Sequence, residues 1–158
     1  MGILLRVLSL SLLVLSPAPA RAQADDRAAV LATVHRLFDG MRAGDSAAVR
    51  AVFHPAALLA TAVVRQGAPG LQVDTLEAFI RAVGTPHGEV WDERIHGEEV
   101  RIDGPLASVW AEYSFHSGGR FSHCGVDAFQ LARGADGWRI IVLSDTRRRE
   151  GCRDGEAK

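Results

Sequence analysis

The chain has 158 residues, of which 47% are hydrophobic and 23% charged, and this length suits one domain. Its formal net charge is −1 at pH 7. A near-neutral surface argues against nucleic acid as a partner. No internal repeat, linker or low-complexity stretch interrupts the sequence.

Residues 1–24 have the features of a secretory signal peptide. One positive charge precedes an apolar run that is too short to span a bilayer, and Ala22-Gln23-Ala24 matches the small-x-small pattern of signal peptidase sites. An uncleaved anchor helix is the alternative. We predict a periplasmic or secreted mature protein that starts at Asp25 and has no membrane partner; losing Arg6 and Arg21 changes the net charge from −1 to −3.

Three helices are predicted upstream of residue 90. Residues 25–43 carry an apolar stripe with the spacing of one helical face, and Gly44 ends this helix. Asp45 or Ser46 then caps a short helix over residues 47–53. This helix stops at His54, because the proline that follows disfavours helix in the residue before it.

A strand is predicted between the second and third helices, over residues 57–65. Residues 66–72 hold three turn formers (Gly67, Pro69 and Gly70) and are predicted to be a loop. The third helix follows a capping box at residues 74–77 and ends at Gly84.

Residues 98–145 are predicted to form four consecutive antiparallel strands, the first of which begins near residue 90. Turn sequences rich in Gly, Pro and Asp separate the β-branched and aromatic runs. In the first hairpin, a tip at Gly104-Pro105 places Val100 opposite Val109 and His96 opposite Tyr113.

The third of these hairpins has the same pattern of apolar pairs near the tip and polar pairs far from it. A tip at Ala135-Asp136 places Phe129 opposite Val142 and Asp127 opposite Ser144. One layer of apolar side chains beside one layer of polar side chains is typical of a cupped sheet with a pocket. The expected pocket residues are Phe129, Val109, Val142, Ser144 and Arg94.

The middle hairpin has two possible registers, and they place opposite faces of its second strand in the pocket. A two-residue Gly118-Gly119 turn puts Cys124, Val126 and Ala128 on the face of Tyr113, whereas a three-residue loop with a bulge puts Gly125, Asp127 and Phe129 there. We favour the bulge, because it buries the larger apolar residues and Gly-Gly readily supplies the positive φ it needs.

Asp127 is the first candidate for chemistry, because a carboxyl group in an apolar cone has a raised pKa that suits proton transfer. Alternatively it pairs with Arg94 or faces solvent. Tyr113, beside His96, could donate to a developing oxyanion, or could be an ordinary core tyrosine. The six histidines lack metal-ligand spacing, and neither a metal nor a cofactor is expected.

Cys124 and Cys152 are expected to form a disulfide, because a lone cysteine pair in an exported chain is usually bonded. The pairing requires the C-terminal tail to fold back toward the second strand of the middle hairpin. Two unpaired thiols are the alternative.

The order of motifs resembles the nuclear transport factor two-like superfamily, in its SnoaL-like or putative lumazine-binding branch, as an exported bacterial member. The motifs are Ala43-Gly44-Asp45, Phe53-His54-Pro55 and Asp136-Gly137-Trp138-Arg139-Ile140. The resemblance spans about residues 26–148. It implies an α+β fold, in which a strongly bent antiparallel sheet wraps around three N-terminal helices as a cone, with a pocket at the open end.

The resemblance implies little about activity. The ketosteroid isomerases of that superfamily carry a tyrosine on the first helix and an acid near the strand after the second, and both are missing here. Three functions remain open: a small-molecule-binding module without catalysis, which we favour; a general acid–base enzyme for a hydrophobic molecule with Asp127 as base; and a pure interaction domain.

A homodimer through the outer face of the sheet is also expected. Trp110, Ile141 and Leu143 are predicted to point away from the helices, and they are surplus to the core of a monomer. Dimers through this sheet are also what the resemblance implies.

Overall fold

The computed structural model describes residues 18–152; residues 1–17, most of the predicted signal peptide, lie outside the described part. Three helices cover the early part of the chain: α1 (Ala18–Ala43), α2 (Ser46–Val52) and α3 (Leu76–Gly84). The six strands are β1 (Phe53–Arg65), β2 (Ala68–Asp74), β3 (Trp91–Asp103), β4 (Leu106–Ser117), β5 (Arg120–Gly134) and β6 (Gly137–Thr146). In the described residues, no helix is long and apolar enough to cross a membrane.

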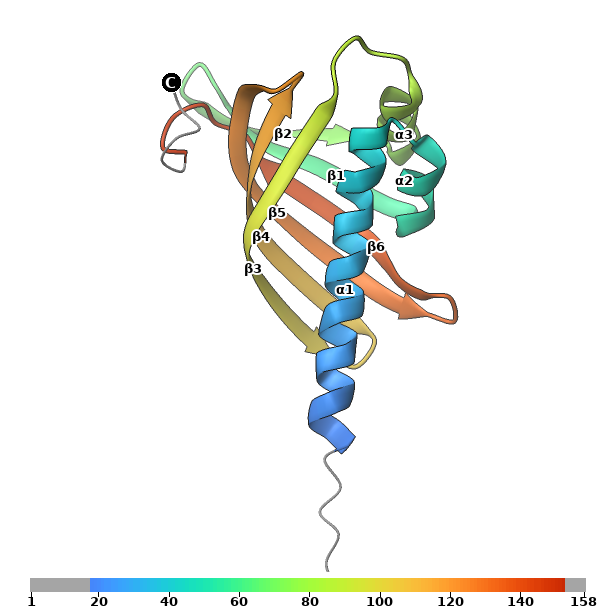
Figure 1. Ribbon diagram of the computed structural model, residues 1–158. Helices are drawn as coiled ribbons and strands as arrows, with labels where there is room; N and C mark the ends of the chain where they lie inside the picture. The colour runs from blue at the N-terminus through green and yellow to red at the C-terminus, as the bar shows by residue number, and fades with distance from the viewer. Residues whose placement is uncertain (1–17, 153–158) are drawn as a thin grey trace, which may run out of the picture.

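The strands form a single bent sheet in the order β2-β1-β6-β5-β4-β3. Every neighbouring pair is antiparallel except β1 and β6, which run parallel. Helix α1 crosses the concave face, with α2 and α3 beside its C-terminal half (Figure 1). The predicted α+β class, a curled sheet around three helices, is confirmed.

The core lies between α1 and the concave face of the sheet. The predicted stripe of α1 is buried, with Val30, Val34 and Leu37 fully inaccessible to solvent. The ring of Phe38 meets that of Phe129 of β5 edge to face, with centroids 6.2 Å apart. Each such side chain contributes about 1.5–3 kcal/mol by burial, so this layer anchors the strands on which the site is built.

Two local predictions about the segment before β3 need correction. Residues 66–72 are not a loop, because β2 begins at Ala68 after a tight turn in which Gln66 and Gly67 both have positive φ. Pro69 is tolerated since β2 is an edge strand, where a missing N–H costs no ladder bond. Helix α3 is capped by Thr75 rather than by Asp74.

The middle hairpin has the predicted bulged register, with Tyr113 opposite Gly125 and Val109 opposite Phe129. Asp127 lies opposite Ala111 and therefore points to the concave face. This choice between two registers determines which strand residues enter the cone.

The outer hairpins differ from the prediction far from their tips, because each contains a bulge. In the first, Val100 faces Val109 as predicted, but a shift at Gly97 places Ile95 rather than His96 opposite Tyr113.

In the third hairpin, a shift at Ile141 places Leu143 opposite Phe129 and Asp145 opposite Asp127. A one-residue shift exchanges the two faces of a strand. Leu143 and Asp145 therefore occupy the face that was predicted for Val142 and Ser144.

Candidate functional site

A cavity of about 530 Å³ opens between α1, α3 and the concave face of the sheet. Its walls are mainly apolar and aromatic side chains from two helices and four strands. They are Leu37, Phe38 and Met41 of α1, Ala78, Phe79 and Ala82 of α3, and Leu59, Trp91, Phe115 and Leu143 of the sheet. The volume lies within the usual range for small-molecule sites.

Two carboxyl groups face each other in the polar part of this cavity. Glu93 enters from β3 and Asp127 from β5, close enough to share a hydrogen bond. Asp127 is only 3% exposed, and its Oδ2 receives no hydrogen bond from a donor of the described residues. Two ionised carboxylates in contact repel each other, so one shared proton is the arrangement that satisfies both groups.

Burial is the main cause of the perturbed acidity of this pair. It raises the pKa of Glu93 to about 7. Burial, followed by the charge of Glu93, also raises the pKa of Asp127 well above its usual value. The two groups titrate as a unit, and the pair therefore keeps one proton near neutral pH.

A second set of polar side chains, formed by Thr61, Asp145 and Arg147, lies next to the carboxyl pair. The Thr61 hydroxyl donates to Asp145 Oδ1 at 2.6 Å, and Arg147 Nε donates to Asp145 Oδ2 at 2.8 Å. A second nitrogen of Arg147 lies 3.3 Å from the Thr61 hydroxyl oxygen. The charge of Asp145 is thus balanced inside the cavity, whereas that of the carboxyl pair is not.

Tyr113 lines the cavity, but its hydroxyl proton is already used. It donates to the main-chain carbonyl of Thr146 at 2.9 Å. The contact passes directly over Gly125, where a Cβ would lie 1.8 Å from the Thr146 oxygen. This geometry matches a structural tyrosine better than a free oxyanion donor, and it explains why position 125 lacks a side chain.

The C-terminal segment folds back against β5, as the disulfide prediction required. Cys124 and Cys152 are bonded, with Cα atoms 5.9 Å apart. Cys124 and Arg148 also exchange two main-chain hydrogen bonds of 2.9 Å. The segment after β6, which carries Arg147, is therefore held over the cavity.

His123 stands at the rim of the cavity among aromatic rings. Its ring centroid lies 5.0 Å from that of Phe115 and 5.7 Å from that of Tyr113. Burial and the positive charge of Arg147 lower the pKa of His123, so its imidazole is neutral at pH 7.

Several predicted site residues lie elsewhere. His96 is on the outer face, 3.8 Å from Glu112. Arg94 is exposed and pairs with Asp92 rather than with Asp127. Val142 and Ser144 also lie on the outer face, so of the predicted polar lining residues only Asp127 and Tyr113 reach the cavity.

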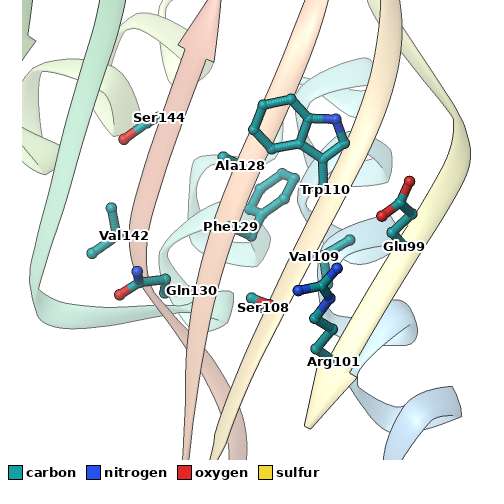
Figure 2. A pocket seen from close by; sticks show the side chains of 10 residues that line it. All are labelled: Glu99, Arg101, Ser108, Val109, Trp110, Ala128, Phe129, Gln130, Val142 and Ser144. Atoms are coloured by element: carbon teal, nitrogen blue, oxygen red, sulfur yellow. The ribbon is translucent and has the colours of Figure 1, made fainter.

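The outer face carries a shallow groove of about 410 Å³ beside Trp110, which is 53% exposed. Figure 2 shows Val142, Ser144 and Ala128 across the strands from this ring. Phe129 and Val109 border the groove, but their side chains belong to the buried core. Of the residues predicted for a dimer interface, Trp110 is on this face, Ile141 occupies the bulge, and Leu143 points into the cavity.

Comparison with known proteins identifies the family. A family model described as "Putative lumazine-binding" matches residues 25–144. The chain belongs to this family. The search of curated proteins found no match to the chain.

Solved structures share its fold at low sequence identity. A protein of unknown function from Mycobacterium tuberculosis is 13% identical with a TM-score of 0.69, over 85% of this chain and 78% of that one. A nuclear transport factor two-like protein with a cystatin-like fold from Novosphingobium aromaticivorans is 15% identical with a TM-score of 0.66, over 90% and 95%. A "putative dehydratase" of the nuclear transport factor two-like family from Streptomyces avermitilis is 17% identical with a TM-score of 0.59, over 80% of this chain and 98% of that one.

Sequence reasoning missed several polar cavity residues of this lumazine-binding family member, among them Glu93, Thr61, Asp145 and Arg147. Glu93 and Asp145 lie beyond the two bulges, which move them to the inner face. A glycine inside the predicted first strand, Gly97, was a usable signal for the first bulge, and in the structure it has a φ of 68°. Among residues 18–152, no group of three or more His, Cys, Asp or Glu side chains could hold a metal ion.

Proposed function

We propose that this protein binds a small molecule with an apolar body inside the cone. The observation that carries the proposal is a cavity of about 530 Å³ with aromatic and aliphatic walls and a few converging polar groups. The family description and the shared fold support small-molecule binding in general terms.

Two features favour binding over catalysis. The Tyr113 proton is already donated to Thr146, and the guanidinium of Arg147 already holds Asp145. Of the three groups considered for catalysis, His96 does not line the cavity. The remaining carboxyl pair can accept or donate a proton, but neither Tyr113 nor Arg147 is free to assist it.

A general acid–base reaction is the second candidate, and the carboxyl pair is the observation that favours it. A buried acid that shares one proton is poised to exchange it near neutral pH. In this alternative Asp127 is the base.

The test is a set of binding measurements on the purified protein. Ligands retained by the native protein are identified by mass spectrometry, and lumazine, named in the family description, is titrated by calorimetry. Ala82→Trp should abolish retention, because Ala82 lines the cavity on α3. Ala51→Trp on the exposed surface of α2 is the matched control. Equal retention by Ala82→Trp and wild type would refute binding in the cone.

Asp127→Asn separates the two candidates. For a binding protein it lowers ligand affinity, and no turnover of the retained molecule is found in wild type. For an enzyme with Asp127 as base, it abolishes turnover and leaves affinity within about tenfold.

We also propose that the chain is exported and dimeric. The Cys124–Cys152 disulfide supports an oxidising compartment. Helix α1 begins at Ala18, so cleavage before Asp25 would remove its first turns. Intact-mass analysis of the periplasmic fraction should find a chain that starts at Asp25, and a chain that retains Met1 would contradict export with cleavage.

The proposed dimer surface is the part of the outer sheet face that surrounds the exposed ring of Trp110.

A further inference from the structure

The acidic groups of the cavity outnumber its basic ones, and this imbalance indicates what kind of ligand it takes. Its described lining includes four carboxyl groups, one guanidinium and one neutral imidazole. They are Asp74 of β2, Glu93 of β3, Asp127 of β5, Asp145 of β6, Arg147 after β6 and His123 of β5. Helices α1 and α3 contribute only apolar side chains to the lining.

The single guanidinium does not reach the carboxyl pair as a partner. Arg147 is engaged by Asp145 and Thr61. Asp74 accepts a hydrogen bond from Gln72. The charge of Arg147 therefore acts on Glu93 and Asp127 only through space, and no described side chain donates a hydrogen bond to Asp127 Oδ2.

Once the pair loses its shared proton, Asp127 Oδ2 is an unfilled acceptor. This atom is buried and no described donor reaches it, and the Asp127 residue lines the cavity. An unsatisfied buried acceptor is destabilising, and a ligand that brings an N–H group satisfies it. Water can fill the site between ligands, but the charge remains.

Aromatic rings surround the same space. Trp91 and Phe115 meet edge to face with centroids 6.3 Å apart, and Phe115 continues to His123. Ring faces attract organic cations, most strongly where water is excluded. They also pack against the apolar part of a ligand.

We infer that the cavity takes an organic cation, a primary or secondary amine with an apolar, preferably aromatic body, whose ammonium donates to Asp127 and Glu93. This inference rests on the proposed binding function and names its ligand class. An anionic ligand is disfavoured, because the only guanidinium of the lining is already paired and the other ionised groups are acidic.

Three probes with one indole body test it: tryptamine, tryptophol and indoleacetate, which differ in an ammonium, a hydroxyl and a carboxylate. Calorimetric titration of the disulfide-bonded protein at pH 8 should give tryptamine an affinity at least about tenfold above that of tryptophol, with indoleacetate weakest. Asp127→Asn should remove most of this tenfold preference and change tryptophol affinity by less than about threefold. Asp136→Asn, at the exposed tip between β5 and β6, is the matched control and should preserve it.

Proton linkage gives a second readout. The ammonium stabilises the fully ionised pair, so tryptamine binding should release a proton, and its affinity should rise from pH 6 to pH 8. Titrations in buffers of different ionisation enthalpy measure this release. Tryptophol should release none.

The outcomes separate this inference from the proposed function. Indoleacetate binding as tightly as tryptamine, or tryptamine affinity unchanged in Asp127→Asn, would overturn the cation inference. Absence of binding by all three probes would also overturn it. In each case the proposed binding function is judged separately, by ligand retention in wild type against Ala82→Trp.

Discussion

Removing the disulfide should destabilise the protein by an amount that can be calculated from its loop. Cys124 and Cys152 are separated by 28 residues. Loop-closure entropy for such a ring corresponds to about 3–4 kcal/mol at 25 °C. Domains of this size have total stabilities of about 5–15 kcal/mol, so the loss is a large fraction of the total.

Cys152→Ser is the cleaner variant, because Cys124 is buried and a hydroxyl there would add a burial penalty. Urea unfolding followed by tryptophan fluorescence should show the free energy of unfolding lowered by about 3–4 kcal/mol. Reductant should lower the stability of wild type by the same amount and leave the variant unchanged. Arg149→Ser, in the same exposed segment, is the control and should change stability by less than about 0.5 kcal/mol.

A Cys152→Ser protein within about 1 kcal/mol of wild type would refute the reasoning. It would mean that the two main-chain hydrogen bonds between Cys124 and Arg148 hold the segment without the covalent link.

Three further results are expected. Gly125→Ala should cost more than about 2 kcal/mol in urea unfolding, because its Cβ would lie 1.8 Å from the Thr146 oxygen, whereas Gly134→Ala has open space and should be nearly neutral. The folded carboxyl pair binds its proton more tightly than the unfolded chain does. As pH rises from 5 to 8, wild type should therefore lose thermal stability relative to Glu93→Gln in melting experiments. A relative gain in stability would contradict the shared proton. Trp110→Asp should convert a dimer to a monomer in sedimentation velocity; a wild type that is monomeric at tens of micromolar would end that proposal.

Periodicity in the sequence was enough to predict the helices, and the resemblance to the nuclear transport factor two-like superfamily implied the class of fold. The stripe of α1 and the turn residues between strands carry information about local structure, and local structure depends on nearby residues. The register of the middle hairpin was also predicted correctly, because only one of its two possible registers buries Phe129. The disulfide was predicted because a lone cysteine pair in an exported chain is usually bonded, and Cys124 and Cys152 are bonded in the structure.

The polar half of the site was decided by tertiary structure. Bulges at Gly97 and Ile141 insert one residue each, and every side chain beyond them changes face. Alternation by itself cannot reveal such an insertion, because the residues before and after it both alternate correctly.

The partner of Asp127 could not be derived from hairpin pairing either. Glu93 lies on β3, two strands away from β5, and only the bend of the sheet brings its carboxyl group to Asp127. The sequence by itself determined the helices, every strand except β2, and one buried acid. The curvature and the bulges determined which other groups share its cavity, because they depend on how the whole sheet packs against the helices.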